Sequence, residues 1–564
     1  MATPRHDNIR NVPDLRELLW GSAGMYGTYP AFREKRDGIY QSISFGRFRD
    51  ETEALGTALC ARLPQGKRSH VLIIGKNSYF WVLSYMALVC GAGIPVPADA
   101  ELSAEELSAL AAECDASAVL YAADEAHKIA ALPGLITVSF EAIPRLVAEG
   151  RSIIAAGDRS FRSRDIDRHA PAALFYTSGT TGRAKGVLLS HANITFLLSQ
   201  IAHMQTVTPS DTFLSVLPLS HVYECVLGFL MPLYCGATVA FAEDLAHLMQ
   251  NMREVHPTTM VTIPFLANAI YEKFWALVKE NGTETQIRRA IAVSDPVRSY
   301  SARQTLKEKL LERARAPFGG VLRRMWVVGA FLPAAVQKGL RQIGIFAVQG
   351  YGLTECAGLA ALGREDVYRD GTAGLCFPDS VIDIYNACPD GSGEIRYKGK
   401  NVMLGYYKDE AQTAAVLDGE WLYTGDFGRI DADGFLHIIG RSQNCIEKTE
   451  GKVCPEELEA LLMQSPFVSE AVVVGVPNAD GTDYEIAALI WCDREHAAEV
   501  LGIDYTAQEL EKAVGDWVSD INEGLVEHKQ IPLFALRDRP FERNAAGRIL
   551  RGGLVDEILS AAEE

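Results

Sequence analysis

The sequence has few of the features that mark secreted, membrane-spanning or nucleic-acid-binding proteins. Its eleven cysteines include no C-x-x-C pair, and neither tail carries a run of single-sign charge. Acidic residues outnumber basic ones by 72 to 54, for a net charge of −18, which argues against general nucleic-acid binding. The scattered cysteines favour free thiols in a reducing compartment over disulfides or zinc ligation.

Long uninterrupted apolar runs are also missing. The opening stretch, MATPRHDNIRNVPDLREL, has no apolar signal core. The most lipid-like stretch, Tyr79–Ala98, is interrupted by Gly91, Gly93, Pro95 and Pro97. It predicts a buried helix followed by a buried strand, not a membrane span. We therefore expect a cytoplasmic protein without a transmembrane segment, and peripheral membrane contact stays open as an alternative.

The sequence does contain a regular alternation of short apolar strands and amphipathic helices. HVLII (His70–Ile74), IPVPA and AVLYA have strand character, and helical patterns separate them. Ser103 and Glu106 have the spacing of a capping box at the start of one such helix. This alternation predicts an α/β fold with a largely parallel sheet.

The length of 564 residues requires more than one domain. From about Gly371 the pattern changes to short strands between Gly and Asp turns, which predicts a small β-rich subdomain. After Arg441 a compact segment mixes helices and strands. We expect an N-terminal domain of stacked α/β subdomains at 1–440, with the β-rich subdomain at about 371–440. A small, mobile α+β C-terminal domain would follow at 441–564.

The stretch YTSGTTGRAKG (Tyr176–Gly186) has the composition of an anion-binding loop. Its glycines let the backbone approach a ligand closely, its hydroxyls are donors, and Lys185 adds a positive charge. Apolar runs on both sides predict a strand–loop–strand or strand–loop–helix unit. It is not the P-loop of nucleotide triphosphatases, because Ala184 precedes Lys185 and Gly186 follows it. The alternative is a flexible surface turn.

Four further stretches place polar residues in apolar surroundings. LPLSHVYE carries His221, VQGYGLTE ends in Thr354 and Glu355, WLYTGDFGRI contains Asp426, and IIGRSQNCIEK contains Arg441. Taken singly, each has an ordinary structural explanation: a satisfied histidine, turn carboxylates and a linker charge.

Together, and in this order with the Tyr176 loop, the motifs resemble the adenylate-forming superfamily of acyl-CoA synthetases, peptide-synthetase adenylation domains and luciferases. The resemblance covers about Thr28 to Gly553. LPLSHVYE and IEKTEGKVCPEELE are most similar to the versions in long-chain fatty acyl-CoA synthetases. The resemblance implies that ATP and a fatty acid give acyl-AMP and pyrophosphate, and that CoA then gives acyl-CoA and AMP.

The resemblance also implies a role for particular residues. Thr354 would contact the α-phosphate, Glu355 would hold Mg²⁺, and His221 would line the acyl pocket beside the reacting carboxylate. The residues that would grip the β- and γ-phosphates are Thr177, Ser178, Gly179, Thr180, Thr181, Gly182 and Lys185. The residues that would form the adenine slot, with Tyr351 stacked on the base, are Gly329, Ala330, Gly350, Tyr351 and Gly352. The remaining nucleotide- and cofactor-binding residues would be Asp426 on the ribose hydroxyls, Arg441, Gln443 at the hinge, and Gly451.

The sequence departs from the family pattern at a catalytic position. Arg548, in RNAAGRILRGGL, stands where the family has a lysine that bridges the carboxylate and α-phosphate, and its planar fork has a different geometry. Gln443 replaces a charged hinge residue, and Lys448 replaces an apolar residue near the CoA site. Two alternatives therefore stay open: a ligase that loads a carrier protein instead of CoA, and a catalytically impaired relative that only binds ATP or acyl-AMP.

Overall fold

The computed structural model of the chain describes most of the sequence, namely residues 9–64, 69–177, 184–292, 311, 313–449, 451–478, 481–492, 494–502, 504–543 and 549–563. The chain divides into two compact units. The first comprises Met1–Ile382, Tyr397–Leu422 and Gly434–Leu436, and the second Asp383–Arg396, Tyr423–Asp433 and His437–Glu564. Parts of the 371–440 segment thus belong to each unit, whereas the sequence suggested one cut after residue 440; that boundary stays a prediction.

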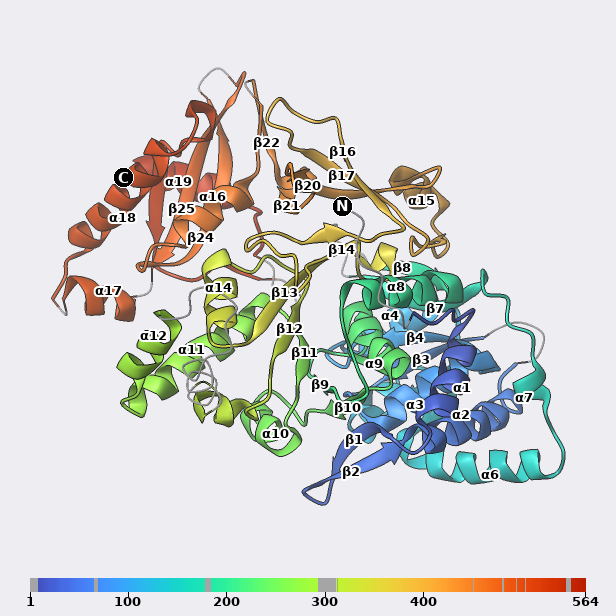
Figure 1. The fold of residues 1–564 in the computed structure, drawn as a ribbon. Coiled ribbons are helices and arrows are strands. Elements are labelled where there is room, and N and C mark those ends of the chain that lie inside the picture. Colours follow the sequence, from blue (N-terminus) through green and yellow to red (C-terminus); the bar gives the residue numbers. More distant parts are fainter. Residues whose placement is uncertain are drawn as a thin grey trace. The chain divides into compact units, whose positions relative to one another are not determined.

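A nine-stranded sheet forms the centre of the first unit (Figure 1). Its strands in spatial order are β15 (Leu375–Cys376), β14 (Ala361–Leu362), β13 (Phe346–Tyr351), β12 (Arg324–Val327), β11 (Thr259–Thr262), β9 (Thr212–Ser215), β10 (Thr238–Phe241), β1 (Pro30–Arg36) and β2 (Ile39–Ser44). The six strands from β13 to β1 run parallel to one another. The outer strands β2, β14 and β15 pair antiparallel.

Both faces of this sheet are buried. Alternate residues of each strand point to opposite faces, so the two faces pack into different hydrophobic clusters. Phe213, Val261 and Trp326 enter one hydrophobic cluster, while Met260 and Met325 enter another. The second cluster packs under helices α10 (Leu248–Val255), α11 (Pro264–Glu280) and α14 (Ala334–Gln342). Helix α12 (Glu284–Ala292) packs on α11, and α11 and α14 lie beside β12 and β13 in Figure 1.

A four-stranded parallel sheet with the order β4–β3–β5–β6 forms a second layer of the first unit. Its strands are β4 (Ile94–Ala98), β3 (His70–Ile74), β5 (Ala116–Tyr121) and β6 (Ile136–Ser139). Its helices are α1 (Leu15–Tyr26), α2 (Phe45–Cys60), α3 (Tyr79–Ala87), α4 (Ala104–Glu113) and α6 (Ile143–Ala155). The predicted capping box is confirmed, since Ser103 and Glu106 exchange both hydrogen bonds at the start of α4.

The apolar stretch Tyr79–Ala98 folds as the sequence predicts. It forms the buried helix α3, a π-turn at Leu88–Ala92 and the buried strand β4. Gly91 takes a positive φ of 145° at the kink between them, a conformation that glycine adopts without strain. Within the described part of the chain, no helix has both the length and the apolar character needed to cross a bilayer.

The predicted anion-binding loop connects two strands of a small antiparallel sheet with the order β18–β8–β7. Strands β7 (Pro171–Thr177) and β8 (Lys185–Ser190) form a hairpin, so the strand–loop–strand alternative is the one observed. The two-residue strand β18 (Gly405–Tyr406) pairs with β8 on its other side. Helix α8 (His191–Met204) follows β8, and α15 (Glu410–Val416) follows β18.

Short strands separated by turns form the predicted β-rich sheet. It contains β16 (Val381–Tyr385), β17 (Gly393–Lys398), β20 (Trp421–Ile430), β19 (Leu417–Asp418) and β21 (Leu436–Arg441).

The second unit continues with a three-stranded sheet of β24 (Val468–Pro477), β25 (Tyr484–Cys492) and β26 (Leu533–Arg537). Val473 and Ile490 face a cluster that includes residues of α16 (Pro455–Leu462) and α18 (Ala507–Glu523). Val472 and Leu489 face the opposite side, under α19 (Leu554–Glu563). Helix α17 (Arg494–Leu501) packs against α18. This unit has the α+β character that the sequence predicts (Figure 1).

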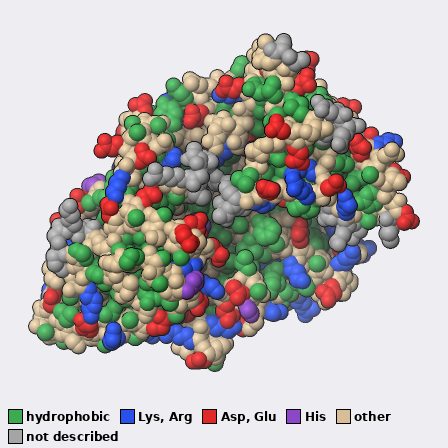
Figure 2. Space-filling view, turned by 180° about the vertical axis from the view of Figure 1, so that it is seen from behind, with side chains coloured by type: hydrophobic (Ala, Val, Ile, Leu, Met, Phe, Trp, Pro, Cys, Tyr) green, Lys and Arg blue, Asp and Glu red, His purple; other side chains and the backbone are tan. Residues whose placement is uncertain are grey.

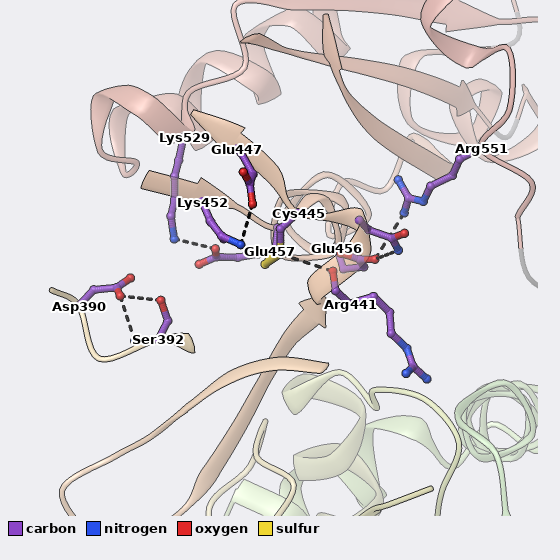
Figure 3. Close-up of a disulfide and its surroundings, with 12 residues drawn as sticks. Asp390, Ser392, Arg441, Cys445, Glu447, Lys452, Glu456, Glu457, Lys529 and Arg551 are labelled. Atoms are coloured by element: carbon purple, nitrogen blue, oxygen red, sulfur yellow. Dashed lines mark hydrogen bonds and ion pairs between the residues drawn. A yellow bond between two sulfur atoms is a disulfide. The ribbon is translucent and has the colours of Figure 1, made fainter. Parts of the chain in front are cut away.

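The prediction that all cysteines are free thiols is wrong for one pair. Cys445 and Cys454 form a disulfide across the ends of the hairpin of β22 (Ile446–Lys448) and β23 (Gly451–Val453) (Figure 3). The pairing of Ile446 with Val453 brings the two cysteines opposite each other. The other nine cysteines are free. The face shown in Figure 2 has acidic and basic side chains interspersed, which agrees with the absence of single-sign charge runs in the sequence.

Candidate active site

Three loops that carry predicted site residues leave the nine-stranded sheet at the same edge. His221 follows β9, Gly329 and Ala330 follow β12, and the Gly350–Glu355 segment spans the end of β13 and the turn after it. Because these strands run parallel, their carboxyl ends share one edge. Ligands bind at this edge in open α/β sheets. The fold therefore brings together residues that are up to 134 positions apart in the sequence, His221 to Glu355.

Hydrogen bonds join these loops. The Tyr223 hydroxyl donates to the Gly352 carbonyl at 2.5 Å and ties the His221 loop to the Gly-Tyr-Gly turn. The side-chain amide of Gln349, on β13, accepts from the Leu332 N–H at 3.2 Å and donates to the Ala330 carbonyl at 3.4 Å. The predicted adenine-slot residues are thus held by a polar network as well as by the sheet.

The Gly-Tyr-Gly turn requires its second glycine for steric reasons. A Cβ at Gly352 would lie 2.2 Å from the Gly358 carbonyl oxygen and 2.4 Å from the Leu359 Cα. Tyr351 lies between the glycines and is only 8% exposed. Gly329, in the neighbouring loop, has a φ of +86° that disfavours other residues. The backbone is therefore closely packed at Gly352.

Thr354 and Glu355 lie in a single 3₁₀ turn, Thr354–Cys356, directly after β13. The turn ends at Ala357, which has a positive φ of 58°, an uncommon conformation for a residue with a Cβ. The side-chain amide of Asn401 donates to the Cys356 and Leu359 carbonyls at 2.7 and 2.8 Å and holds this turn in place.

Glu355 and Lys185, a predicted metal ligand and a predicted phosphate-binding residue, meet at one tyrosine. The Tyr406 hydroxyl donates to Glu355 Oε1 at 2.7 Å, and Lys185 Nζ lies 5.1 Å from the centroid of the Tyr406 ring. Lys185 Nζ also donates to Gln412 Oε1 at 3.0 Å. Burial, and then the nearby Glu355 carboxylate, raise the pKa of the Tyr406 phenol well above its usual value, so the hydroxyl stays protonated as a donor.

The loop between Thr177 and Lys185 can be described only at its base. These two residues pair across the hairpin and close the loop. Ser178, Gly179, Thr180, Thr181 and Gly182 lie outside the described residues, so their predicted phosphate contacts stay predictions.

His221 lies in an exposed loop that a buried polar cluster supports. Its Nε2 is 3.6 Å from Asp99 Oδ2, and its side chain is 57% exposed. The Asn77 amide donates to the Leu217 carbonyl at 2.7 Å and accepts from the Leu219 N–H at 2.9 Å, just before His221. Asn77 also donates to Ser215 Oγ at 2.9 Å.

Glu224, three residues after His221, is the innermost member of this cluster. It is fully buried and accepts from Ser215 Oγ at 2.6 Å. Its other oxygen has no hydrogen-bond partner among the residues that the structure describes. Burial raises the pKa of Glu224 to about 8, against an ordinary value of 4.5, although the Ser215 hydrogen bond opposes the shift. The carboxyl is therefore mostly neutral at pH 7.

The second unit contains the predicted ribose-binding carboxylate. Asp426 is 5% exposed, and its Oδ1 lies 2.9 Å from Arg441 Nη1. The Thr424 hydroxyl accepts from the Asp426 N–H at 3.1 Å and donates to the Ile395 carbonyl at 2.6 Å, which fixes the turn. The two predicted residues are therefore brought together as an ion pair.

The predicted hinge residue Gln443 and the predicted cofactor residue Gly451 come shortly after Arg441 in the sequence. Gln443 lies in the 3₁₀ turn Ser442–Asn444, and Gly451 opens β23 with a φ of +146°. Figure 3 shows the Arg441 side chain extending away from Cys445 and Glu456, which lie near its backbone. Arg548 lies outside the described residues. Arg551, three positions further on, is bonded to Glu459 at 2.8 Å.

Sequence reasoning missed Tyr406, Asn77 and Glu224. Tyr406 is the first of two adjacent tyrosines in LGYYKD, and nothing local separates it from Tyr407. Asn77, in GKNS, reads as an ordinary turn residue, and Glu224 as an exposed acid at a helix start. Tyr406 and Asn77 gain their roles from contacts with residues more than 40 positions away. Glu224 bonds to the nearby Ser215, and its role comes from its burial.

Solved structures of adenylate-forming enzymes share this fold. One is the o-succinylbenzoate CoA synthetase MenE of Bacillus subtilis in complex with its acyl-adenylate intermediate, with a TM-score of 0.71 and 20% identity over 95% of this chain and 97% of that one. Another is ATP-bound MatB from Rhodopseudomonas palustris, with a TM-score of 0.75 and 20% identity over 97% and 99%. A Mycobacterium tuberculosis fatty acyl CoA synthetase has a TM-score of 0.66 and 21% identity over 97% and 99%.

The family model described as AMP-binding enzyme matches residues 19–407. The chain therefore belongs to the AMP-binding enzymes, the adenylate-forming superfamily that its motifs resemble. Among curated relatives, it is 28% identical to the long-chain-fatty-acid–CoA ligase FadD15 of Mycobacterium tuberculosis, over 83% of this chain and 80% of that protein. It is 26% identical to the long-chain-fatty-acid–CoA ligase ACSBG2 of Rattus norvegicus, over 84% and 76%.

Proposed function

We propose that the protein activates a long-chain fatty acid with ATP to give acyl-AMP and pyrophosphate, and then transfers the acyl group to CoA, releasing AMP. The use of ATP and CoA follows from the family. The choice of a long-chain acid is supported by curated relatives that carry this activity in their names and match over most of their length. The observation that carries the proposal is the shared contact of Lys185 and Glu355 with Tyr406.

The reaction requires positive charge at the phosphates, which a lysine and a metal ion would supply. Lys185, at the base of the predicted phosphate loop, supplies a positive charge on a flexible stem. Thr354, next to Glu355 in the 3₁₀ turn, supplies a hydroxyl for the α-phosphate. Catalysis of this type depends on positioning and charge stabilisation, because the protein itself forms no bond to phosphorus.

The described residues fit Mg²⁺ held partly by the nucleotide. Among them no group of three or more His, Cys, Asp or Glu side chains could form a metal cage. Mg²⁺ keeps several waters and takes one or two carboxylates together with substrate phosphates. Glu355, a single carboxylate with one oxygen occupied by Tyr406, suits this arrangement. When bound, the ion would neutralise charge on the phosphates.

The remaining roles follow the family pattern. Asp426 would accept the ribose hydroxyls, and Arg441, already beside it, would assist there or at a phosphate. Tyr351 would stack on adenine. His221 would lie beside the acid, and the Asn77 cluster would hold its loop. Arg548 would take the place of the family's lysine at the carboxylate and α-phosphate.

Product analysis by mass spectrometry tests the proposal. The protein would be incubated with ATP, Mg²⁺ and a panel of acids, with and without CoA. The panel would span fatty acids of several chain lengths, o-succinylbenzoate and anthranilate, because the fold neighbours include synthetases for the aromatic acids. We expect acyl-CoA and AMP from the long-chain acids. Acyl-CoA from the aromatic acids alone would overturn the substrate class.

Two further outcomes identify the alternatives. Acyl-AMP that accumulates without transfer to CoA would indicate a carrier-protein acceptor. If no product forms, Arg548→Lys would be tested next. A gain of several hundredfold in adenylation would identify a decayed enzyme, whereas an unchanged or lower rate would exclude that explanation.

A further inference from the structure

Tyr406 occupies a fixed position between two charged residues of the proposed ATP site. Strand β18 places Tyr406 opposite Val187 of β8. Backbone hydrogen bonds on both sides of it, from Leu404 N–H to Leu188 O at 2.9 Å and from Tyr407 N–H to Gly186 O at 2.7 Å, extend this pairing. Tyr406 is thereby held beside strand β8, which begins with Lys185.

A second set of contacts fixes the same segment against the Glu355 turn. The Met403 N–H donates to the Glu355 carbonyl at 2.8 Å. The Tyr406 N–H donates to Thr413 Oγ1 at 2.9 Å, on α15. With the Asn401 bonds described above, residues 401–407 connect the phosphate-loop hairpin to the turn that carries Glu355. The 8% exposure of Tyr406 leaves its ring little freedom to move.

The contacts of Tyr406 keep the two charges apart. Among the described residues no ion pair joins Lys185 and Glu355, although both contact Tyr406. The ring face attracts the ammonium group through a cation–π interaction, while the neutral hydroxyl donates to Glu355 Oε1 without cancelling its charge. A direct Lys185–Glu355 pair would neutralise both groups before Mg·ATP arrives.

We propose that Tyr406 is a positioning residue that orients the Glu355 carboxylate for Mg²⁺ and holds Lys185 away from it, ready for a phosphate. Hydrogen bonds to a ligating carboxylate fix its orientation, and their loss typically lowers metal affinity 10- to 100-fold. The inference rests on the proposed function, since it assumes that Glu355 and Lys185 serve Mg·ATP.

The test compares two adjacent tyrosines that each donate to a carboxylate. Tyr406→Phe removes the hydroxyl on Glu355 and keeps the ring. Tyr407→Phe removes a hydroxyl that donates to Asp115 at 2.9 Å, in an exposed contact outside the site. ATP binding would be measured by calorimetry over a series of Mg²⁺ concentrations, with the thermal midpoint recorded in the absence of nucleotide.

We expect Tyr406→Phe to need about tenfold more Mg²⁺ for half-maximal ATP binding. Its ATP affinity without Mg²⁺ and its thermal midpoint should match those of wild type, and Tyr407→Phe should match wild type throughout. Tyr406→Leu, which also removes the ring, should lower ATP affinity at every Mg²⁺ concentration because Lys185 loses its support.

Three results would overturn the inference. These are an unchanged Mg²⁺ requirement in Tyr406→Phe, an equal change in Tyr407→Phe, or a loss of ATP affinity in Tyr406→Phe that does not depend on Mg²⁺. Failure of the proposed function looks different, because wild type itself would then show no Mg²⁺-dependent ATP binding and no acyl-AMP.

Discussion

Glu355 in the first unit and Asp426 in the second are both carboxylates with predicted roles at the nucleotide, yet the chain surrounds them differently. Glu355 accepts a hydrogen bond from a neutral phenol and has no ion-pair partner in the described chain. Asp426 is nearly buried and lies 2.9 Å from the guanidinium of Arg441. A neutral donor orients a carboxylate and leaves its charge for an incoming cation, whereas a cationic donor compensates that charge in advance.

The difference fits what each carboxylate would bind. Mg²⁺ is itself a cation and would be repelled by a resident arginine, so Glu355 requires a neutral neighbour. The ribose hydroxyls are neutral donors, so Asp426 needs no spare charge and can stay buried because Arg441 compensates it. An unpaired buried charge would be costly.

The largest effect is expected from removing the charge of Glu355. Glu355→Gln keeps an oxygen that accepts from Tyr406 but removes the charge that would hold Mg²⁺. We expect acyl-AMP formation to slow by about 10²- to 10³-fold, measured as single-turnover pyrophosphate release at saturating ATP and Mg²⁺. Glu420→Gln, at an exposed ion pair with Lys398, is the matched control and should match wild type. A rate within tenfold of wild type for Glu355→Gln would exclude Glu355 as the metal ligand.

Asp426→Asn should have a smaller effect that appears in binding. An ionised carboxylate accepts stronger hydrogen bonds than an amide, so ATP affinity should fall by about 10- to 100-fold. The sharper readout is a comparison of ATP with 2′,3′-dideoxy-ATP by calorimetry. Wild type should prefer ATP, and the variant should lose most of that preference. Equal discrimination in both proteins would show that Asp426 does not bind the ribose.

A third carboxylate, Glu224, extends the contrast to a group with neither a cation nor access to solvent. Its folded pKa of about 8 exceeds the ordinary 4.5, so between these values the folded state binds more protons than the unfolded state. This contribution to stability is fully present below pH 4.5 and is lost as pH rises through about 8. The free energy of unfolding should therefore fall by about 2 kcal/mol between pH 6 and 8 from this group.

Glu224→Gln should remove that loss, so the variant gains stability relative to wild type as pH rises. The measurement is hydrogen exchange, followed by mass spectrometry, of peptides from residues 212–235 at pH 6, 7 and 8, corrected for the intrinsic exchange rate. Parallel pH dependences in the two proteins would show that Glu224 ionises normally despite its burial.

The parts of the molecule that could be predicted from sequence are those fixed by local interactions. The capping box at Ser103 and the apolar strands at His70 and Ile94 depend on neighbouring residues or on simple patterning. The order of the motifs likewise indicated which loops carry the candidate site residues. The parallel strands then place His221 and Glu355 at one edge, as expected for an α/β sheet.

The missed features depend on contacts between distant segments. The two-residue strand β18 is too short to show a pattern, and it exists because it pairs with β8, more than 200 residues earlier. Tyr406 therefore could not be separated from Tyr407 before the fold was known. The Cys445–Cys454 disulfide was missed for a similar reason, since the hairpin pairing between β22 and β23, not the spacing of the cysteines, brings them together.

The smallest effect is expected at Gln412, which accepts a hydrogen bond from Lys185. Gln412→Ala removes the 3.0 Å hydrogen bond to Lys185 Nζ, and one such bond corresponds to about a threefold loss of ATP affinity. Glu410→Ala, in the same turn of α15, is the control and should bind ATP as wild type does.

Combined with Tyr406→Leu, Gln412→Ala should reduce the free energy of ATP binding by more than the sum of the two separate changes, because either contact alone can still restrain the lysine. Strict additivity in this double-mutant cycle would show that the ring and the amide act on Lys185 independently. The Tyr406 ring alone would then keep Lys185 apart from Glu355.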